Sequence, residues 1–107
     1  MTDAAIVVLT NLPDRQTAQL LARRLVEGRL AACVNIGASV ESIYHWHGEI
    51  ETANEVPVAI KTRRVLYSEV EAVIRQIHPY EVPEIVAIAL CDALPPYVDW
   101  IRAETRR

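Results

Sequence analysis

The chain has 107 residues, of which 51% are hydrophobic, and a formal net charge of −3. This length predicts one domain, residues 1–107, with a thin core that oligomerisation would supplement. The acidic balance argues against a nucleic-acid partner. No apolar run approaches the roughly 20 residues of a membrane span, and the first residues lack the basic region of a signal peptide. We therefore expect a cytoplasmic protein with no membrane partner.

The first half of the chain alternates apolar runs with turn residues. Ala4 to Thr10 is β-branched and apolar, which predicts a buried strand. A helix capped by Asp14 and stopped by Gly28 follows, and then a strand from Ala31 to Ile36. Residues 40–62 form a long hairpin that turns at His47-Gly48 and carries Pro57 at an edge or a bulge.

The second half repeats the helix and strand pattern. Residues 65–77 have helical apolar spacing, and the connector from His78 to Glu84 contains two prolines, which make it stiff. A strand from Ile85 to Leu90 and a short helix after Pro96 complete the chain. The order predicts an α+β fold, the ferredoxin-like (split βαβ) sandwich, with four antiparallel strands in spatial order 4-1-3-2 and two helices on one face.

The topology suggests which polar side chains come together. We expect the carboxyl ends of the first and third strands to meet the amino ends of the second and fourth. That arrangement would gather Thr10, Cys33, Lys61 and the connector at one end of the sheet, and would send Cys91 and the hairpin tip to the other end.

A metal site is one interpretation of this grouping. Cys33 and His78 are ligands that copper(I) or zinc would accept, and Glu84 or Glu81 could complete the site or orient the imidazole. Cys33 could equally be a small buried hydrophobic residue, and His78 could bind free carbonyls at the helix end. A separate chelate on the hairpin, formed by His45, His47 and Glu49, is less favoured than a solvated surface.

No catalytic motif is present in the sequence. Gly-rich phosphate loops, nucleophile elbows and HExxH are absent, and Cys33 lacks nearby sequence cations that would stabilise a thiolate for attack. We expect no enzyme activity. Tyr44 and Trp46 place large apolar surfaces on a projecting hairpin, which favours burial against a neighbouring subunit.

Six segments resemble one protein family in order and in detail. They are Leu12 to Asp14, Leu30 to Ile36, Ser42 to Ile50, Ile60 to Thr62, His78 to Ile85 and Tyr97 to Ile101. The chain is similar to the CutA divalent-cation tolerance proteins across almost its whole length. The resemblance implies a ferredoxin-like fold, a tight homotrimer like that of the PII signalling proteins, and a response to metal ions with copper binding. It implies no enzyme activity.

The chain departs from the copper-linked pattern of the family. Members with a proposed copper site carry Cys where Thr10 stands and a His-His pair where Ile77-His78 stands. Only His78 is retained, so the resemblance implies weak copper binding at most, with Cys33 replacing part of the lost affinity.

The leading hypothesis is a divalent-cation tolerance protein that forms a homotrimer locked by Tyr44 and Trp46. Its intersubunit cleft would be lined by Lys61, Tyr80 and Glu81. One alternative is a PII-like sensor of a small metabolite, for example an anion held by the basic cluster Lys61, Arg63 and Arg64. Another alternative is a structural platform for protein interactions.

Overall fold

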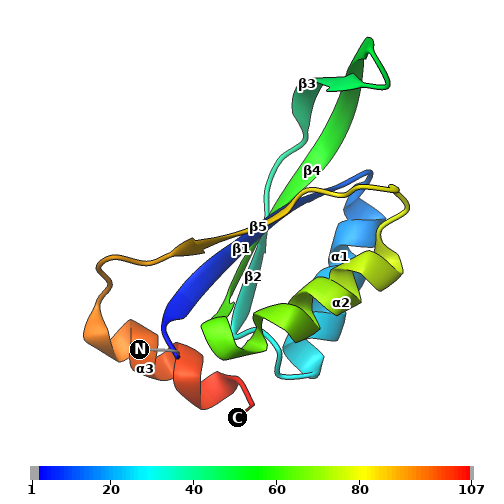
Figure 1. Cartoon of the computed structure of the whole chain (residues 1–107). Coiled ribbons are helices and arrows are strands. Elements are labelled where there is room, and N and C mark those ends of the chain that lie inside the picture. The colour runs from blue at the N-terminus through cyan, green and yellow to red at the C-terminus, as the bar shows by residue number, and fades with distance from the viewer. Residues whose placement is uncertain (1–2, 107) are drawn as a thin grey trace.

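The computed structural model describes residues 3–106. Three consecutive strands lie between the first two helices, and one strand separates the last two (Figure 1). In order they are β1 (Ala5–Leu12), α1 (Arg15–Glu27), β2 (Cys33–Ile36), β3 (Val40–Trp46), β4 (Glu49–Arg63), the 3-10 turn η1 (Arg64–Leu66), α2 (Tyr67–Ile77), β5 (Ile85–Ala89) and α3 (Pro95–Glu104).

The strands form one antiparallel sheet in the order β2-β4-β1-β5. Read from β5, this is the predicted 4-1-3-2 order, so the ferredoxin-like fold is confirmed. The sequence analysis did not separate β3 as a fifth strand. It pairs only with the first part of β4, while the later part of β4 lies between β1 and β2.

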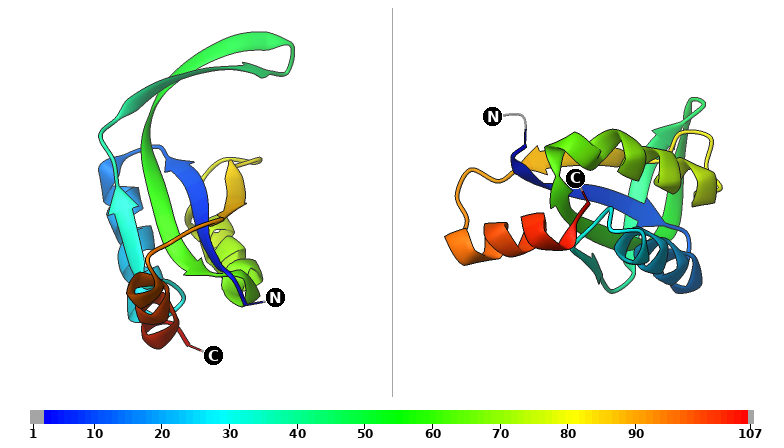
Figure 2. Two further views of the ribbon diagram at one scale, coloured as in Figure 1. Left: turned by 90° about the vertical axis from the view of Figure 1, so that its left-hand side faces the viewer. Right: turned by 90° about the horizontal axis from the view of Figure 1, so that it is seen from below.

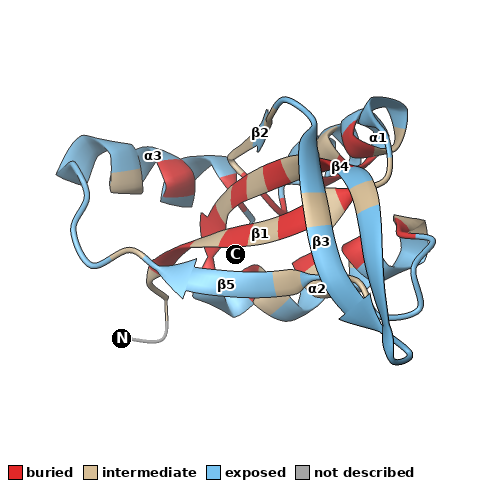
Figure 3. Cartoon of the chain, turned by 90° about the horizontal axis from the view of Figure 1, so that it is seen from above, coloured by how far each residue is buried: buried red, intermediate tan, exposed pale blue. Residues whose placement is uncertain are grey.

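One face of the sheet is covered by helices and the other is largely open. Side chains alternate along β1, so Ile6 and Val8 point into the core, where Ile60 of β4 and the apolar stripes of α1 and α2 join them. On the opposite face Val86 and Ile88 of β5 are exposed. Figure 3 shows the same division, with buried residues along β1 and the inner part of β4 and exposed residues along β3 and β5.

The hairpin made by β3 and the first part of β4 projects beyond the body of the domain and curls over it (Figures 1 and 2). This gives the molecule its long dimension, 44 × 26 × 23 Å along the principal axes. His47 and Gly48 both have positive φ angles, 51° and 78°, and Trp46 pairs with Glu49 across them. The predicted tight two-residue turn is therefore confirmed.

Pro57 lies on a central strand, so the expectation of an edge position is wrong. The pairing along that side of β4 is nevertheless interrupted there, because residues 37–39 between β2 and β3 lie opposite residues 56–57. Gly37 approaches Pro57 so closely that a Cβ would come within 3.0 Å of the proline ring. The extra residue lies in the segment 37–39 and not in β4, so the prediction that the strand of Pro57 is bulged is also wrong.

The helix ends follow local sequence signals. Asp14 accepts a hydrogen bond from the backbone N–H of Thr17 at 2.7 Å, and Gly28 caps the other end of α1. The second helix begins later than predicted, because residues 64–66 form a 3-10 turn before α2. The last helix begins at Pro95 and buries Ile101.

The predicted meeting of strand ends is wrong. Each helix crossover joins two parallel strands, so the carboxyl end of β1 lies with the carboxyl end of β2 and with the amino end of β5. The connector and the hairpin therefore share one end of the sheet with Thr10, which pairs with Ile85. Cys33 and Lys61, which pair with each other, lie toward the other end, where Cys91 is found.

Candidate functional site

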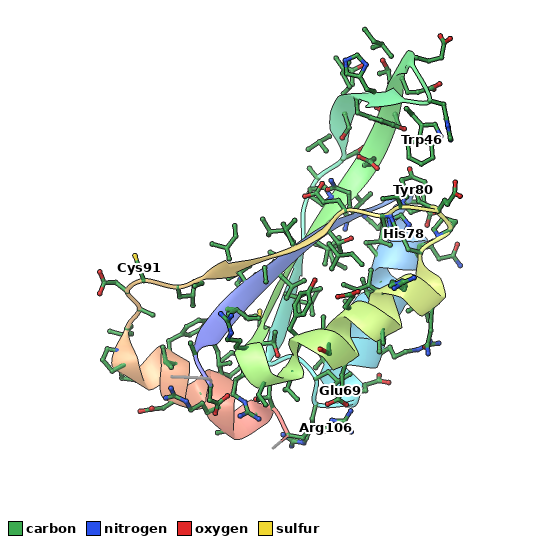
Figure 4. All side chains as sticks on the ribbon, in the orientation of Figure 1. Trp46, Glu69, His78, Tyr80, Cys91 and Arg106 are labelled. Carbon is green, nitrogen blue, oxygen red and sulfur yellow. The ribbon has the colours of Figure 1, made fainter. Side chains whose placement is uncertain are left out.

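A cavity of about 550 Å³ lies between the inner face of the hairpin and the connector after α2. Its walls include Asn11, Tyr44, Trp46, Glu55, Tyr80 and Glu84. Figure 4 shows Trp46 on the hairpin side and Tyr80 and His78 on the connector side, with Cys91 at the far end of the molecule. This is the candidate site, and Glu81 also lines it. The assignment of Lys61, Tyr80 and Glu81 to a cleft between subunits stays a prediction.

His78 fastens the connector to the end of β1. Its Nε2 lies 2.5 Å from the backbone oxygen of Asn11, and its Nδ1 lies 3.2 Å from the backbone nitrogen of Tyr80. A carbonyl can only accept and a backbone N–H can only donate, so Nε2 carries the proton and Nδ1 is the acceptor. Both ring nitrogens of the buried His78 are therefore in use.

Glu84 is held by the side chain of the same asparagine. The Asn11 amide donates to Glu84 Oε1 at 2.9 Å, while the Asn11 carbonyl accepts from His78. Sequence analysis missed Asn11 as a site residue. A signal was available, because a hydrogen-bonding amide at the end of an apolar strand is suited to fastening an adjacent loop.

Glu55 is the most buried carboxylate of the site. It is only 7% exposed and begins the apolar part of β4. Burial, followed by the negative charge of Glu55 and a hydrogen bond to it, raises the pKa of Tyr80. Sequence analysis missed Glu55 too, although period-2 alternation places it on the side of β4 opposite the core residue Val56.

The predicted ligands Cys33, His78 and Glu84 do not come together. Cys33 is level with Val7 of β1, whereas His78 contacts Asn11, four residues further along that strand, a separation of about 13 Å. Across residues 3–106, no three His, Cys, Asp or Glu side chains are grouped closely enough to hold a metal ion.

Copper does not fit the residues present at this end of the sheet. His78 has no free ring nitrogen to offer. Thr10, at the family's cysteine position, is buried in the helix-covered face, and its hydroxyl has no hydrogen-bond partner within residues 3–106. Ile77 packs against the core at the end of α2.

The three residues of the basic cluster have different surroundings. Lys61 does not line this cavity, and its ammonium contacts the side chain of Asn35 on the open face. Arg63 is buried and donates to both carboxylate oxygens of Asp3, to the Thr105 hydroxyl and to the backbone oxygen of Arg106. Arg63 is therefore occupied by internal partners, and the hypothesis of an anion held by the basic cluster in a cleft between subunits stays a prediction.

The two faces of the hairpin differ in apolar exposure. Tyr44 and Trp46 face the cavity and are 39% and 38% exposed, whereas Ile43 and Ile50 on the outer face are 68% and 70% exposed. Sequence analysis assigned Tyr44 and Trp46 to a trimer interface, which stays a prediction, and overlooked Ile43 and Ile50. The alternation of the strand was the available signal.

Comparisons with known proteins agree with the fold. A divalent-cation tolerance protein CutA from Thermus thermophilus is 40% identical over 99 residues, which cover 92% of this chain and 96% of that protein. The human protein CutA is 42% identical over 93 residues, and the match covers 87% of this chain but only 52% of the human protein.

Solved structures of the same family are similar to this chain in fold and in sequence. CutA1 from Shewanella sp. SIB1 has a TM-score of 0.95 at 38% identity, with the whole of both chains covered. The Thermus thermophilus Cut A1 structure has a TM-score of 0.93 at 39% identity, covering 95% of this chain and 99% of that one. The family model described as "CutA1 divalent ion tolerance protein" matches residues 6–104, and the chain belongs to that family.

Proposed function

We propose that this protein supports divalent-cation tolerance as a homotrimer without enzyme activity. The observation that carries the proposal is the family match over residues 6–104, together with relatives named for divalent-cation tolerance. The cytoplasmic location belongs to the same proposal. No helix among residues 3–106 is long and apolar enough to cross a membrane, and a relative's structure from Archaeoglobus fulgidus is named periplasmic.

Exposed apolar surface supports the trimer. The exposed residues are Ile43 and Ile50 on the outer face of the hairpin and Val86 and Ile88 on the open face of the sheet. Groups of exposed apolar side chains are typical of surfaces that bind another protein chain. The outer strands β2 and β5 also present edges that could pair with another chain. Closed symmetry buries such edges and apolar faces together.

Solution mass tests the assembly. We expect light scattering to give roughly 36 kDa, three times the 12.0 kDa of one chain. The double variant Ile43→Asp and Ile50→Asp should shift the mass toward one chain, because it places charges in an apolar interface. Glu41→Gln, on the same outer face, is the matched control and should keep the full mass. A wild-type mass of about 12 kDa would contradict the trimer.

Growth under metal load tests the function. A bacterial host lacking its own CutA homologue should grow better in copper or zinc when it produces the wild-type chain. The assembly-breaking double variant should restore growth less than Glu41→Gln does, at matched protein levels. Equal growth with an empty vector would refute the proposed role.

Copper binding in this proposal is weak, because residues 3–106 do not supply a preformed set of three ligands. Calorimetric titration with Cu(II), with Cu(I) under reducing conditions and with Zn(II) measures it directly. His78→Ala should leave the metal affinity unchanged, and so should Cys33→Ser at the other end of the sheet. A submicromolar site that disappears in His78→Ala would show that the imidazole is a ligand after all.

A further inference from the structure

Glu55 is a buried carboxylate with no cation beside it. It is 7% exposed, and no salt bridge among residues 3–106 includes it. The Tyr80 hydroxyl lies near enough for Glu55 to help raise the pKa of that phenol, whereas an ionised carboxylate can accept about four hydrogen bonds. Burying such a group is unfavourable unless a positive partner compensates the charge. The carboxylate lines the cavity, so the partner can come from outside the chain.

Aromatic rings face the same space. Strand alternation and the register of β3 with β4 place Tyr44 and Trp46 on the same face of the hairpin as Glu55. Tyr80 approaches from the connector, and its ring contacts that of His78 with centroids 4.5 Å apart. The faces of such rings attract ammonium and guanidinium groups, and indole attracts them most strongly.

The remaining charges of the cavity also favour a positively charged ligand. Glu81 and Glu84 add carboxylates at its border, and no Lys or Arg lines it in the part of the chain that the structure describes. An anionic metabolite would therefore be repelled. A bare metal ion would lack a set of close ligands among the described residues, and it would gain nothing from the apolar rings.

We propose that the cavity between the hairpin and the connector binds a small organic cation, an ammonium or guanidinium compound, with Glu55 as the charge partner and Trp46, Tyr44 and Tyr80 as the aromatic walls. The volume of about 550 Å³ is within the range of small-molecule sites. This binding activity is distinct from metal tolerance, and it uses the inner face of the hairpin while the outer face remains available to another copy.

The experiment compares a cation with its neutral isostere. Calorimetry of the full chain with n-butylguanidinium and with n-butylurea, both in EDTA to remove divalent metals, separates charge from shape. We expect binding of the guanidinium compound and no measurable binding of the urea. Rising salt should weaken the interaction less than it weakens a surface ion pair, because the carboxylate is buried.

Two variants assign the interaction to residues. Glu55→Gln keeps the shape of the side chain and removes its charge, so it should weaken guanidinium binding by about thirtyfold. Trp46→Leu should weaken it by about threefold to tenfold. Glu41→Gln, an exposed carboxylate on the outer face of the hairpin, is the matched control and should bind as the wild type does.

Three results would overturn the proposal. These are equal binding of n-butylurea, unchanged guanidinium binding in Glu55→Gln, and no binding of the guanidinium probe to the wild-type protein. None of them bears on metal tolerance, which is measured by growth. The two proposals can therefore fail separately.

Discussion

Two buried charges lie on the same strand, and they have opposite surroundings. Arg63 and Glu55 of β4 are each 7% exposed. Arg63, near the chain termini, is surrounded by internal partners, namely Asp3, the Thr105 hydroxyl and the Arg106 carbonyl. Glu55, beside the hairpin, has a tyrosine hydroxyl and an open cavity.

The difference separates a structural charge from one that is available to a ligand. A buried charge with a full set of partners holds elements together, and here Arg63 ties β4 to the N-terminal segment and to the end of α3. A buried charge without a counterion lowers stability until something binds it. The two residues are equally buried, so it is their partners that distinguish them.

The largest change in stability is expected for Arg63→Ala. We expect the free energy of unfolding to fall by about 3 kcal/mol, since several charge-assisted hydrogen bonds are lost and their acceptors remain. Urea denaturation measures the change. Arg64→Ala removes the neighbouring exposed arginine and should change stability by less than about 0.5 kcal/mol. Similar losses in both variants would mean that the partners of Arg63 contribute little.

Glu55→Gln is expected to raise the free energy of unfolding, whereas Arg63→Ala lowers it. Neutralising an uncompensated buried carboxylate should raise the free energy of unfolding by about 1 to 2 kcal/mol in ligand-free protein. The same denaturation experiment, with Glu41→Gln as the exposed control, measures it. A clear loss of stability would mean that Glu55 has an internal charge partner in solution.

Thr10→Val extends the contrast to an uncharged group. The Thr10 hydroxyl is buried without a hydrogen-bond partner, so replacing it by a methyl group should stabilise the chain by up to about 1 kcal/mol. Thr62→Val is the matched control, because the Thr62 hydroxyl donates to the Leu30 carbonyl at 2.6 Å. That variant should lose stability. Equal effects in the two variants would contradict the assignment.

The smallest effect concerns alkaline pH. The pKa of Tyr80 is raised in the folded chain, by burial first and then by Glu55. The stability linked to the neutral phenol is complete below the unfolded-state pKa of about 10 and is lost as pH rises through the folded-state pKa. Denaturation between pH 8 and 11.5 should show a smaller alkaline loss for Tyr80→Phe than for the wild type. An identical pH profile would mean that ionisation of Tyr80 does not contribute to the alkaline loss of stability.

The fold could be predicted from local patterns because each signal acts over a few residues. Asp14, Gly28 and the His47-Gly48 turn set element ends through their own backbone chemistry, and the structure agrees with all three. The candidate site was harder to predict. It depends on which strand ends meet, and one error in strand direction placed Cys33 beside His78 when they lie at different ends.

Side-chain roles were the least predictable part. The position of His78 in the sequence is compatible with a metal ligand or with a residue that holds the connector in place. Its two contacts, to Asn11 and Tyr80, identify the second role. Glu55 was overlooked because its importance lies in a missing partner, which no local pattern encodes. The outer apolar residues Ile43 and Ile50 could have been found from alternation alone.

The 15 residues of β4 form one continuous strand that runs from the hairpin tip to Arg63. A projecting module is usually joined to its domain by two loops and can be excised. Here only the β3 side has a break, at residues 37–39, and the β4 side continues into the middle of the sheet. The hairpin therefore has no hinge on that side, and shortening it from the tip is the only truncation that leaves the central strand intact.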